Sequence, residues 1–218
     1  NVAVGRQSMY ANTTGSNNVG IGQAALGANT EGGDNVAVGA LAGDANTTGA
    51  GLTAIGKGAA GANTTANYNT AVGGAALAVN TTGAGNTAVG YGALDANTTA
   101  SNNVAVGYGA ASANTTATDV VAVGTNALTA NTTGAINTAV GNFSLDANTT
   151  GHSNSALGGY SLTANTTGNY NVAIGRNAMA ANTTASNNVA IGGNSPLDAN
   201  TTGDSNVAVG SGNCLGAN

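Results

Sequence analysis

The sequence predicts an all-β fold, a parallel β-solenoid (β-roll) built from about thirteen 17-residue coils, and three observations support it. An Asn-Thr motif begins at Asn12 and recurs at every seventeenth residue up to Asn182. Gly, Asn and β-branched residues dominate each repeat, while charged residues make up only 5% of the chain. A fixed short period is the signature of stacked coils, and a unit interrupted by Gly, Asn and Thr leaves no helical stripe.

The repeat can be read as seventeen places, with the Asn of this motif at place 1. The consensus is then N-T-T-G-x-x-N-V-A-V-G-x-x-A-L-x-A. Asn200 and Asn218 each follow at an interval of 18 residues, so residues 1–218 form a single repeat array whose last two coils, 183–218, are irregular. Because the array starts and stops inside the repeat, we expect a slice of a longer fibrous protein or a unit that stacks end to end.

Places 7 to 11, with the sequence Asn-Val-Ala-Val-Gly, alternate like a β-strand that ends at an invariant Gly. Place 10 is a branched aliphatic residue in every copy, such as Val4, Ile21 and Leu157, and we predict that this column is core. A charge at Val106 should then destabilise the protein more than a charge at the turn residue Tyr108.

A second strand is expected from place 15 to place 3, joined to the first by variable turns at places 5–6 and 12–13. Leu26 and Leu77 represent place 15, which would face inward together with places 17 and 2. Places 16, 1 and 3 would face solvent, because Asp44 and Glu31 occur there, and stacked Asn side chains should hydrogen-bond from coil to coil. Places 1 and 3 form a candidate ligand-facing ladder of Asn46, Thr48, Asn97, Thr99, Asn114, Thr116, Asn131, Thr133, Asn148 and Thr150.

Place 9 is the most informative column for assembly, because it accepts only Ala or Gly in thirteen copies. It lies between place 7, which is Asn except at Leu52 and Val120, and the Gly at place 11. A face so small and uncharged suits the close approach of another backbone, so we expect a homo-oligomer; a monomer with a bare face is the alternative. The candidate oligomer face comprises Ala37, Ala71, Ala88, Ala105, Ala122, Ala139, Ala173 and Ala190.

Aromatic residues avoid the columns assigned to the core and are expected on exposed turn edges. There they are either candidate contacts for a partner or scattered surface residues without a role. All three cations, Arg6, Lys57 and Arg176, share place 12. The candidate exposed aromatics are Tyr68, Tyr91, Tyr108, Phe143, Tyr160 and Tyr170.

No residue pattern indicates catalysis, a metal or a cofactor, and we expect none of the three. His152 is the only histidine and has no second ligand at metal-binding spacing. Cys214 has no neighbouring histidine to act as a base, so we interpret it as a packed thiol. The acidic residues form no column of the kind that calcium-binding glycine-rich repeats require.

The small number of cations also limits the partners. Three cations leave no basic patch for nucleic acid, and no run of eighteen apolar residues predicts membrane insertion of this segment. Asn-Thr-Thr is a glycosylation sequon, but glycans on every coil would lie about 4.8 Å apart and crowd one another. We interpret the sequon as a by-product of the ladder.

Three segments resemble known fibrous proteins: NTAVGYGAL at 86–94, NNVAVGYGA at 102–110 and NVAIGRNAM at 171–179. They resemble the head repeats of YadA-like trimeric autotransporter adhesins and the NTAVG-type repeats of trimeric phage tail fibres. The resemblance covers the chain through its NVAVG strand, whereas the ANTTG half is not part of the adhesin head motif. It implies a left-handed roll, three chains side by side, Val and Ile in each chain's core, and an extracellular, cell-surface or virion location.

We therefore expect a structural or adhesive fibre segment, a rigid shaft or head that presents its turn edges to a surface or receptor. The expected partners are copies of the chain itself, as a trimer or end-to-end fibre, and a cell surface or glycan. One alternative is a phage tail-fibre segment that binds host surface glycans. Another is an ice-binding solenoid, since regular Thr or Asn/Thr arrays on weakly charged solenoids suit that function, although Asp at place 16 would disturb a water lattice.

Overall fold

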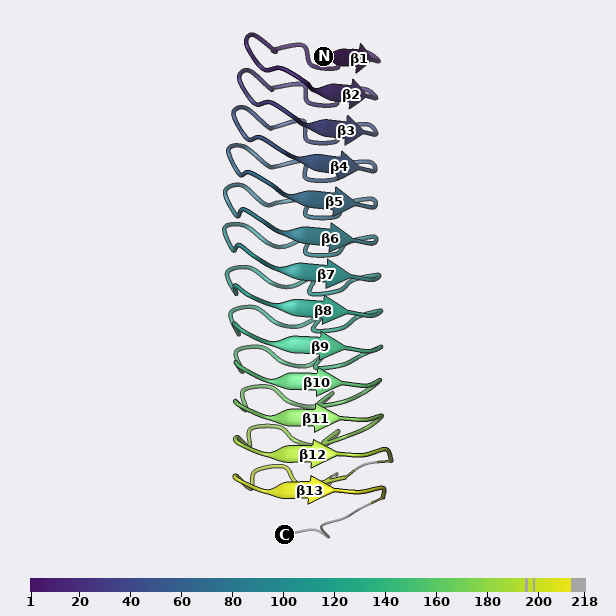
Figure 1. Ribbon diagram of the computed structural model, residues 1–218, viewed down its shortest axis with the longest axis vertical. Helices are drawn as coiled ribbons and strands as arrows, with labels where there is room; N and C mark the ends of the chain where they lie inside the picture. Colours follow the sequence, from purple (N-terminus) through teal and green to yellow (C-terminus); the bar gives the residue numbers. More distant parts are fainter. Residues whose placement is uncertain (195, 198, 213–218) are drawn as a thin grey trace. The chain divides into compact units, whose positions relative to one another are not determined.

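The computed structural model describes residues 1–194, 196–197 and 199–212, and these residues form parallel β-strands without any helix. Each repeat contributes one strand, made by places 8 to 10, so the chain is a β-solenoid (Figure 1). It divides into two compact units, Asn1–Val106 and Gly107–Asn218. The first unit contains β1 (Val2–Val4), β2 (Val19–Ile21), β3 (Val36–Val38), β4 (Thr53–Ile55), β5 (Thr70–Val72), β6 (Thr87–Val89) and β7 (Val104–Val106). The second contains β8 (Val121–Val123), β9 (Thr138–Val140), β10 (Ser155–Leu157), β11 (Val172–Ile174), β12 (Val189–Ile191) and β13 (Val207–Val209).

Within each unit the strands pair in parallel and in chain order. Ala37 of β3 lies beside Ala54 of β4, which is one repeat later, so each place of the repeat forms a column in space. Between β12 and β13 the offset becomes one residue longer, and Val189 pairs with Val207. The strand register therefore survives, and the additional residue is accommodated in the coil between the two strands.

The strands face the opposite way from our expectation. Ala37 at place 9 is fully buried, whereas its neighbours Val36 and Val38 at places 8 and 10 are only half-buried. Val106 lies on the same outward side, so the prediction that place 10 is core is wrong. At Gly20 even the Cβ of an alanine would lie 2.7 Å from Ser8 Oγ and 3.2 Å from Met9 Cγ, so the interior leaves no room for a larger side chain at place 9.

The other side of each coil is a succession of turns, so the predicted second strand is also wrong. Ala24 at place 13 and Leu26 at place 15 have left-handed φ values of 55° and 51°. The N–H of Gly27 donates to the Ala24 carbonyl at 3.1 Å, and the N–H of Asn29 donates to the Leu26 carbonyl at 3.1 Å. These tight turns replace strict alternation, so places 15 and 1 both point inward, whereas place 17 is only half-buried.

The invariant Gly at place 11 has two causes. Gly39 has a φ of 134°, a backbone conformation that side chains rarely adopt. A Cβ at this position would also lie 2.7 Å from the carbonyl carbon and oxygen of Gly56 in the next coil. The repeat therefore requires Gly wherever the strand leaves the sheet.

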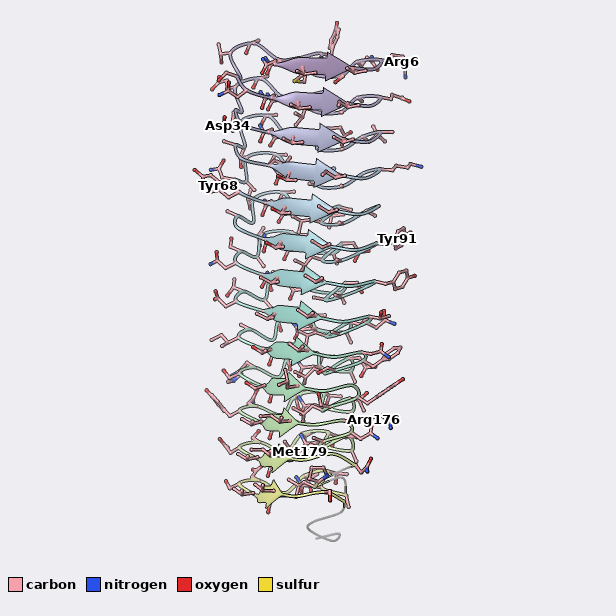
Figure 2. All side chains as sticks on the ribbon, turned by 45° about the vertical axis from the view of Figure 1, so that its right-hand side comes forward. Arg6, Asp34, Tyr68, Tyr91, Arg176 and Met179 are labelled. Carbon is pink, nitrogen blue, oxygen red and sulfur yellow. The ribbon has the colours of Figure 1, made fainter. Side chains whose placement is uncertain are left out.

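The variable places lie on two opposite edges, as predicted. In the first unit, Figure 2 places Asp34 and Tyr68, both at place 6, on one edge and Arg6 and Tyr91, both at place 12, on the other. The sheet and the row of turns connect these edges. Side chains at the edges leave the coil without disturbing its core.

Candidate interaction surfaces

The Asn column at place 1 lies inside the coil. Asn46 is fully buried, and its Nδ2 donates to Asn29 Oδ1 at 2.8 Å and to the Gly49 carbonyl at 2.9 Å. Its Oδ1 accepts from Asn63 Nδ2 at 2.9 Å. The predicted coil-to-coil hydrogen bonding is therefore confirmed. The predicted outward position of place 1 is wrong, because the Asn side chains bond to one another inside the coil. The same burial holds for Asn97, Asn114, Asn131 and Asn148.

A second buried Asn ladder occupies place 7, a column that the sequence suggested would border the oligomer face at place 9; that outward position is wrong. Asn35 Oδ1 accepts from the Leu52 N–H at 2.8 Å, and Asn35 Nδ2 donates to the Gly49 carbonyl at 2.9 Å. Gly49 thus accepts from both ladders, which ties neighbouring coils together. Every buried side-chain nitrogen or oxygen in the described residues has a hydrogen-bond partner. The apolar replacements Leu52 and Val120 at place 7 were the signal that this column is internal.

The Thr residues of the candidate ladder remain on the surface. Thr48 is exposed, and its hydroxyl has no hydrogen-bond partner among the described residues. The preceding Thr47 differs, because its Oγ1 donates to the Thr64 carbonyl in the next coil at 3.0 Å. A ligand-facing ladder would therefore consist of Thr alone. The other exposed members are Thr99, Thr116, Thr133 and Thr150.

The Ala column proposed as an oligomer face is not on the surface. These residues fill the narrow space between the sheet and the place-15 side chains, and a residue enclosed there cannot touch another chain. The predicted oligomer face is therefore wrong for Ala37, Ala71, Ala88, Ala105, Ala122, Ala139, Ala173 and Ala190, all of which are fully buried.

The surface that does face outward from the sheet is formed by places 8 and 10, and we call it the strand face. Place 10 is always Val, Ile or Leu, and place 8 is Val, Thr or Ser, so no charge interrupts it. Ile55 and Leu157 are 40% and 49% exposed. The strand face of the first unit consists of Val2, Val4, Val19, Ile21, Val36, Val38, Thr53, Ile55, Thr70, Val72, Thr87, Val89, Val104 and Val106. That of the second consists of Val121, Val123, Thr138, Val140, Ser155, Leu157, Val172, Ile174, Val189, Ile191, Val207 and Val209.

The candidate aromatics lie at the turn edges. Phe143 is only half-buried and stacks on Tyr160, with 5.4 Å between ring centroids. His152 meets Tyr170 edge-on, with 4.9 Å between centroids. The predicted exposure is confirmed for Tyr68, Tyr91, Tyr108, Tyr160 and Tyr170.

Two acidic groups at place 16, Asp44 and Asp95, are partly buried. Partial burial raises the pKa of Asp44 and of Asp95 above 3.8, and hydrogen bonds to the backbone oppose this only in part. No group of three or more potential metal ligands occurs in the part of the chain that the structure describes. Nor does a helix long and apolar enough to cross a membrane occur there. Cys214, which we interpret as a packed thiol, lies outside the described residues.

The fold defines the class of this protein as a tandem-repeat parallel β-solenoid with a narrow, amide-laddered core. Comparisons with known proteins found no matching family model, no matching curated protein and no matching solved structure. The interpretation of function therefore depends on the surfaces described above.

Proposed function

We propose that this chain is a rigid segment of an extracellular homo-oligomeric fibre, in which the strand face of each copy packs against the strand faces of its partners. The observation that carries this proposal is the exposure of branched aliphatic side chains at place 10 in coil after coil. Ile55, Ile174 and Ile191 are 40%, 38% and 37% exposed. The Ala column has no part in the contact.

The size of the strand face supports an interaction. Strands spaced about 4.8 Å apart, with three residues of about 3.4 Å each, give a flat area on the order of 300 Å² in each unit. The largest apolar patch of a typical soluble protein covers about 300 to 600 Å² and is often functional. Packing it against another chain would remove the aliphatic columns from water.

A second copy of the chain is the partner that fits best. Its strand face has the same spacing of coils, so its side chains would meet equivalent side chains along the whole contact. Neither surface carries a charge, so no ion would lose its hydration when the two join. Branched aliphatic residues such as Val72 and Ile55 can then interdigitate, as in packed sheets.

Stiffness suits a fibre as well. Each coil is joined to the next by the strand pairs, by the place-1 ladder through Asn46 and by the place-7 ladder through Asn35. Stability of this kind is the sum of neighbour contacts, so it extends along the stack. The resemblance to YadA-like heads and phage tail fibres favours a fibre of three chains in an extracellular, cell-surface or virion setting.

Sedimentation equilibrium of the chain tests the fibre proposal. We expect a mass of three chains that persists to micromolar concentration. A single-chain mass at every concentration would contradict it.

The exposed Thr column favours a second candidate function, ice binding. Thr48, Thr65 and Thr82 recur at the coil spacing on the side away from the sheet, and their hydroxyls have no partner among the described residues. Thermal hysteresis of the freezing point, lost when Thr82, Thr99, Thr116 and Thr133 are replaced by Lys, would favour this function. Absence of hysteresis in the unmodified chain would exclude ice binding and leave the fibre proposal.

A further inference from the structure

One turn edge of the first unit carries a shallow hollow between Lys57 and Tyr91. Both residues stand at place 12, two coils apart, and the place-12 residue between them is Gly74. A Cβ built on Gly74 would lie 3.4 Å from Tyr91 Cδ2, so the missing side chain leaves room for the ring. The rest of the lining is Leu41, Gly58, Ala75 and Ala78.

A second hollow follows on the same edge, nearer the start of the unit. It is lined by Gln7, Tyr10, Ala24, Gly27 and Asp44. These residues stand at places 13 and 16, as do Leu41 and Ala78 of the first hollow. The two hollows therefore succeed each other along the coil stack, over a length of about 23 Å from Tyr10 to Tyr91.

The chemistry of this edge is mixed. Tyr91 presents a ring that is 61% exposed, and Tyr10 one that is 81% exposed. Lys57 is exposed, and it forms no ion pair with any described residue. Asp44 adds a half-buried carboxylate, so the first hollow carries a cation, the second carries an anion, and both are lined in part by Gly and Ala.

Several classes of ligand do not match this chemistry. A peptide that adds as a strand needs free backbone groups, but the Ala75 N–H already donates to the Lys57 carbonyl at 3.0 Å. Nucleic acid needs several cations, and the lining of both hollows includes only Lys57. A compact apolar ligand needs a cavity that encloses most of its surface, which an open edge does not provide.

A sugar chain does match. Pyranose rings have an apolar C–H face that packs on an aromatic ring and a rim of hydroxyls that both accept and donate hydrogen bonds. We propose that this edge of the first unit binds a neutral oligosaccharide lying parallel to the coil stack. Tyr91 packs against one sugar ring, while the Lys57 ammonium donates to hydroxyls and the Asp44 carboxylate accepts from them.

The proposal does not depend on the fibre. The strand face and this edge are different sides of the coil, so sugar binding at the edge does not require packing through the strand face. An experiment can therefore contradict the fibre proposal without contradicting sugar binding, and the reverse also holds.

The test uses the complete chain and a panel of immobilised neutral oligosaccharides built from glucose, galactose, mannose or N-acetylglucosamine, followed by calorimetry with the best binder. Tyr91→Ala should weaken binding at least tenfold. Ala78→Leu should do the same by filling the hollow without removing any proposed contact. Tyr68→Ala, on the opposite edge, and Ala180→Leu, at place 16 of the second unit, are the matched controls and should bind like the unmodified chain.

Circular dichroism of each variant must match that of the unmodified chain, and a variant that does not is replaced by Lys57→Ala, which removes an exposed side chain. Binding to none of the neutral sugars would overturn the proposal. Equal affinity of the Tyr91→Ala and Tyr68→Ala variants would overturn it too.

Discussion

Leu52 fills the space that Gly43 leaves in the core: a Cβ built on Gly43 would lie 3.0 Å from Leu52 Cδ2. Place 15 usually carries the large side chain and place 7 the Asn, but here the large side chain has moved to the other side of the coil. Ala111 at place 15 and Val120 at place 7 repeat the exchange, and both are fully buried. At both sites a large side chain at place 7 therefore follows a small one at place 15.

This relationship predicts compensation between the two sites. Gly43→Leu alone should overpack the coil and lower the free energy of unfolding by about 1 to 3 kcal/mol. Adding Leu52→Asn restores the common pair and should recover most of the loss, since Leu26 already adopts a φ close to that of Gly43. Urea denaturation, monitored by circular dichroism, gives the free energy of unfolding of the two single variants and of the double variant. Strictly additive effects would show that the two side chains do not share one space.

The Asn ladder predicts a large difference between two residues of one coil. Asn46→Ala removes three buried hydrogen bonds and leaves Asn29 Oδ1 without its donor. The free energy of unfolding should fall by about 3 kcal/mol. Thr48→Ala, at an exposed hydroxyl, should change it by less than about 0.5 kcal/mol. Similar losses at both positions in chemical denaturation would place Asn46 outside the core.

The direction of the strand can be tested with one pair of adjacent residues. Ala88 is fully buried, and Val89 faces outward. Ala88→Leu should destabilise the chain by about 1 to 3 kcal/mol, because the interior has no room for the added carbons. Val89→Leu adds a single methylene on the outside and should be nearly neutral. A lower melting temperature for Val89→Leu than for Ala88→Leu would show that place 10, and not place 9, faces the core.

Asp44 predicts a pH dependence of stability. Burial raises the pKa of its carboxyl above 3.8, so the folded chain holds the proton more tightly than the unfolded chain. This residue therefore lowers stability as the pH rises from 3.8 through the folded pKa. Asp44→Asn should raise the melting temperature slightly at pH 7, and the gain should disappear below pH 3.8, because both states are then protonated. A gain of the same size at pH 3 would point to a cause other than ionisation.

The period, the parallel stacking, the variable edges and the Gly at place 11 could all be predicted, because each follows from repetition. The direction of the strand could not. Alternation at Val36, Ala37 and Val38 defines two faces, and placing the larger residues inside is the usual rule. That rule fails here because Leu side chains from the opposite side already occupy the narrow interior, so only Ala or Gly fits at place 9.

The row of turns escaped prediction for a different reason. Leu at positive φ is uncommon, so a Leu column at place 15 appeared to belong to a strand. Burial of the Leu side chain offsets the free-energy cost of the positive φ. The hollow beside Tyr91 was equally hidden, because it depends on a side chain that Gly74 lacks and not on any motif.

The most direct measurement of the central claim is the mass of two charge variants by sedimentation equilibrium. Val72→Lys with Val89→Lys places two charges on the strand face, whereas Thr82→Lys with Thr99→Lys places two on the opposite side of the coil. The Thr pair should sediment with the same oligomer mass as the unmodified chain, and the Val pair should sediment as a folded monomer with unchanged circular dichroism. An oligomer that survives in the Val pair, or dissociates equally in both, would contradict packing through the strand face.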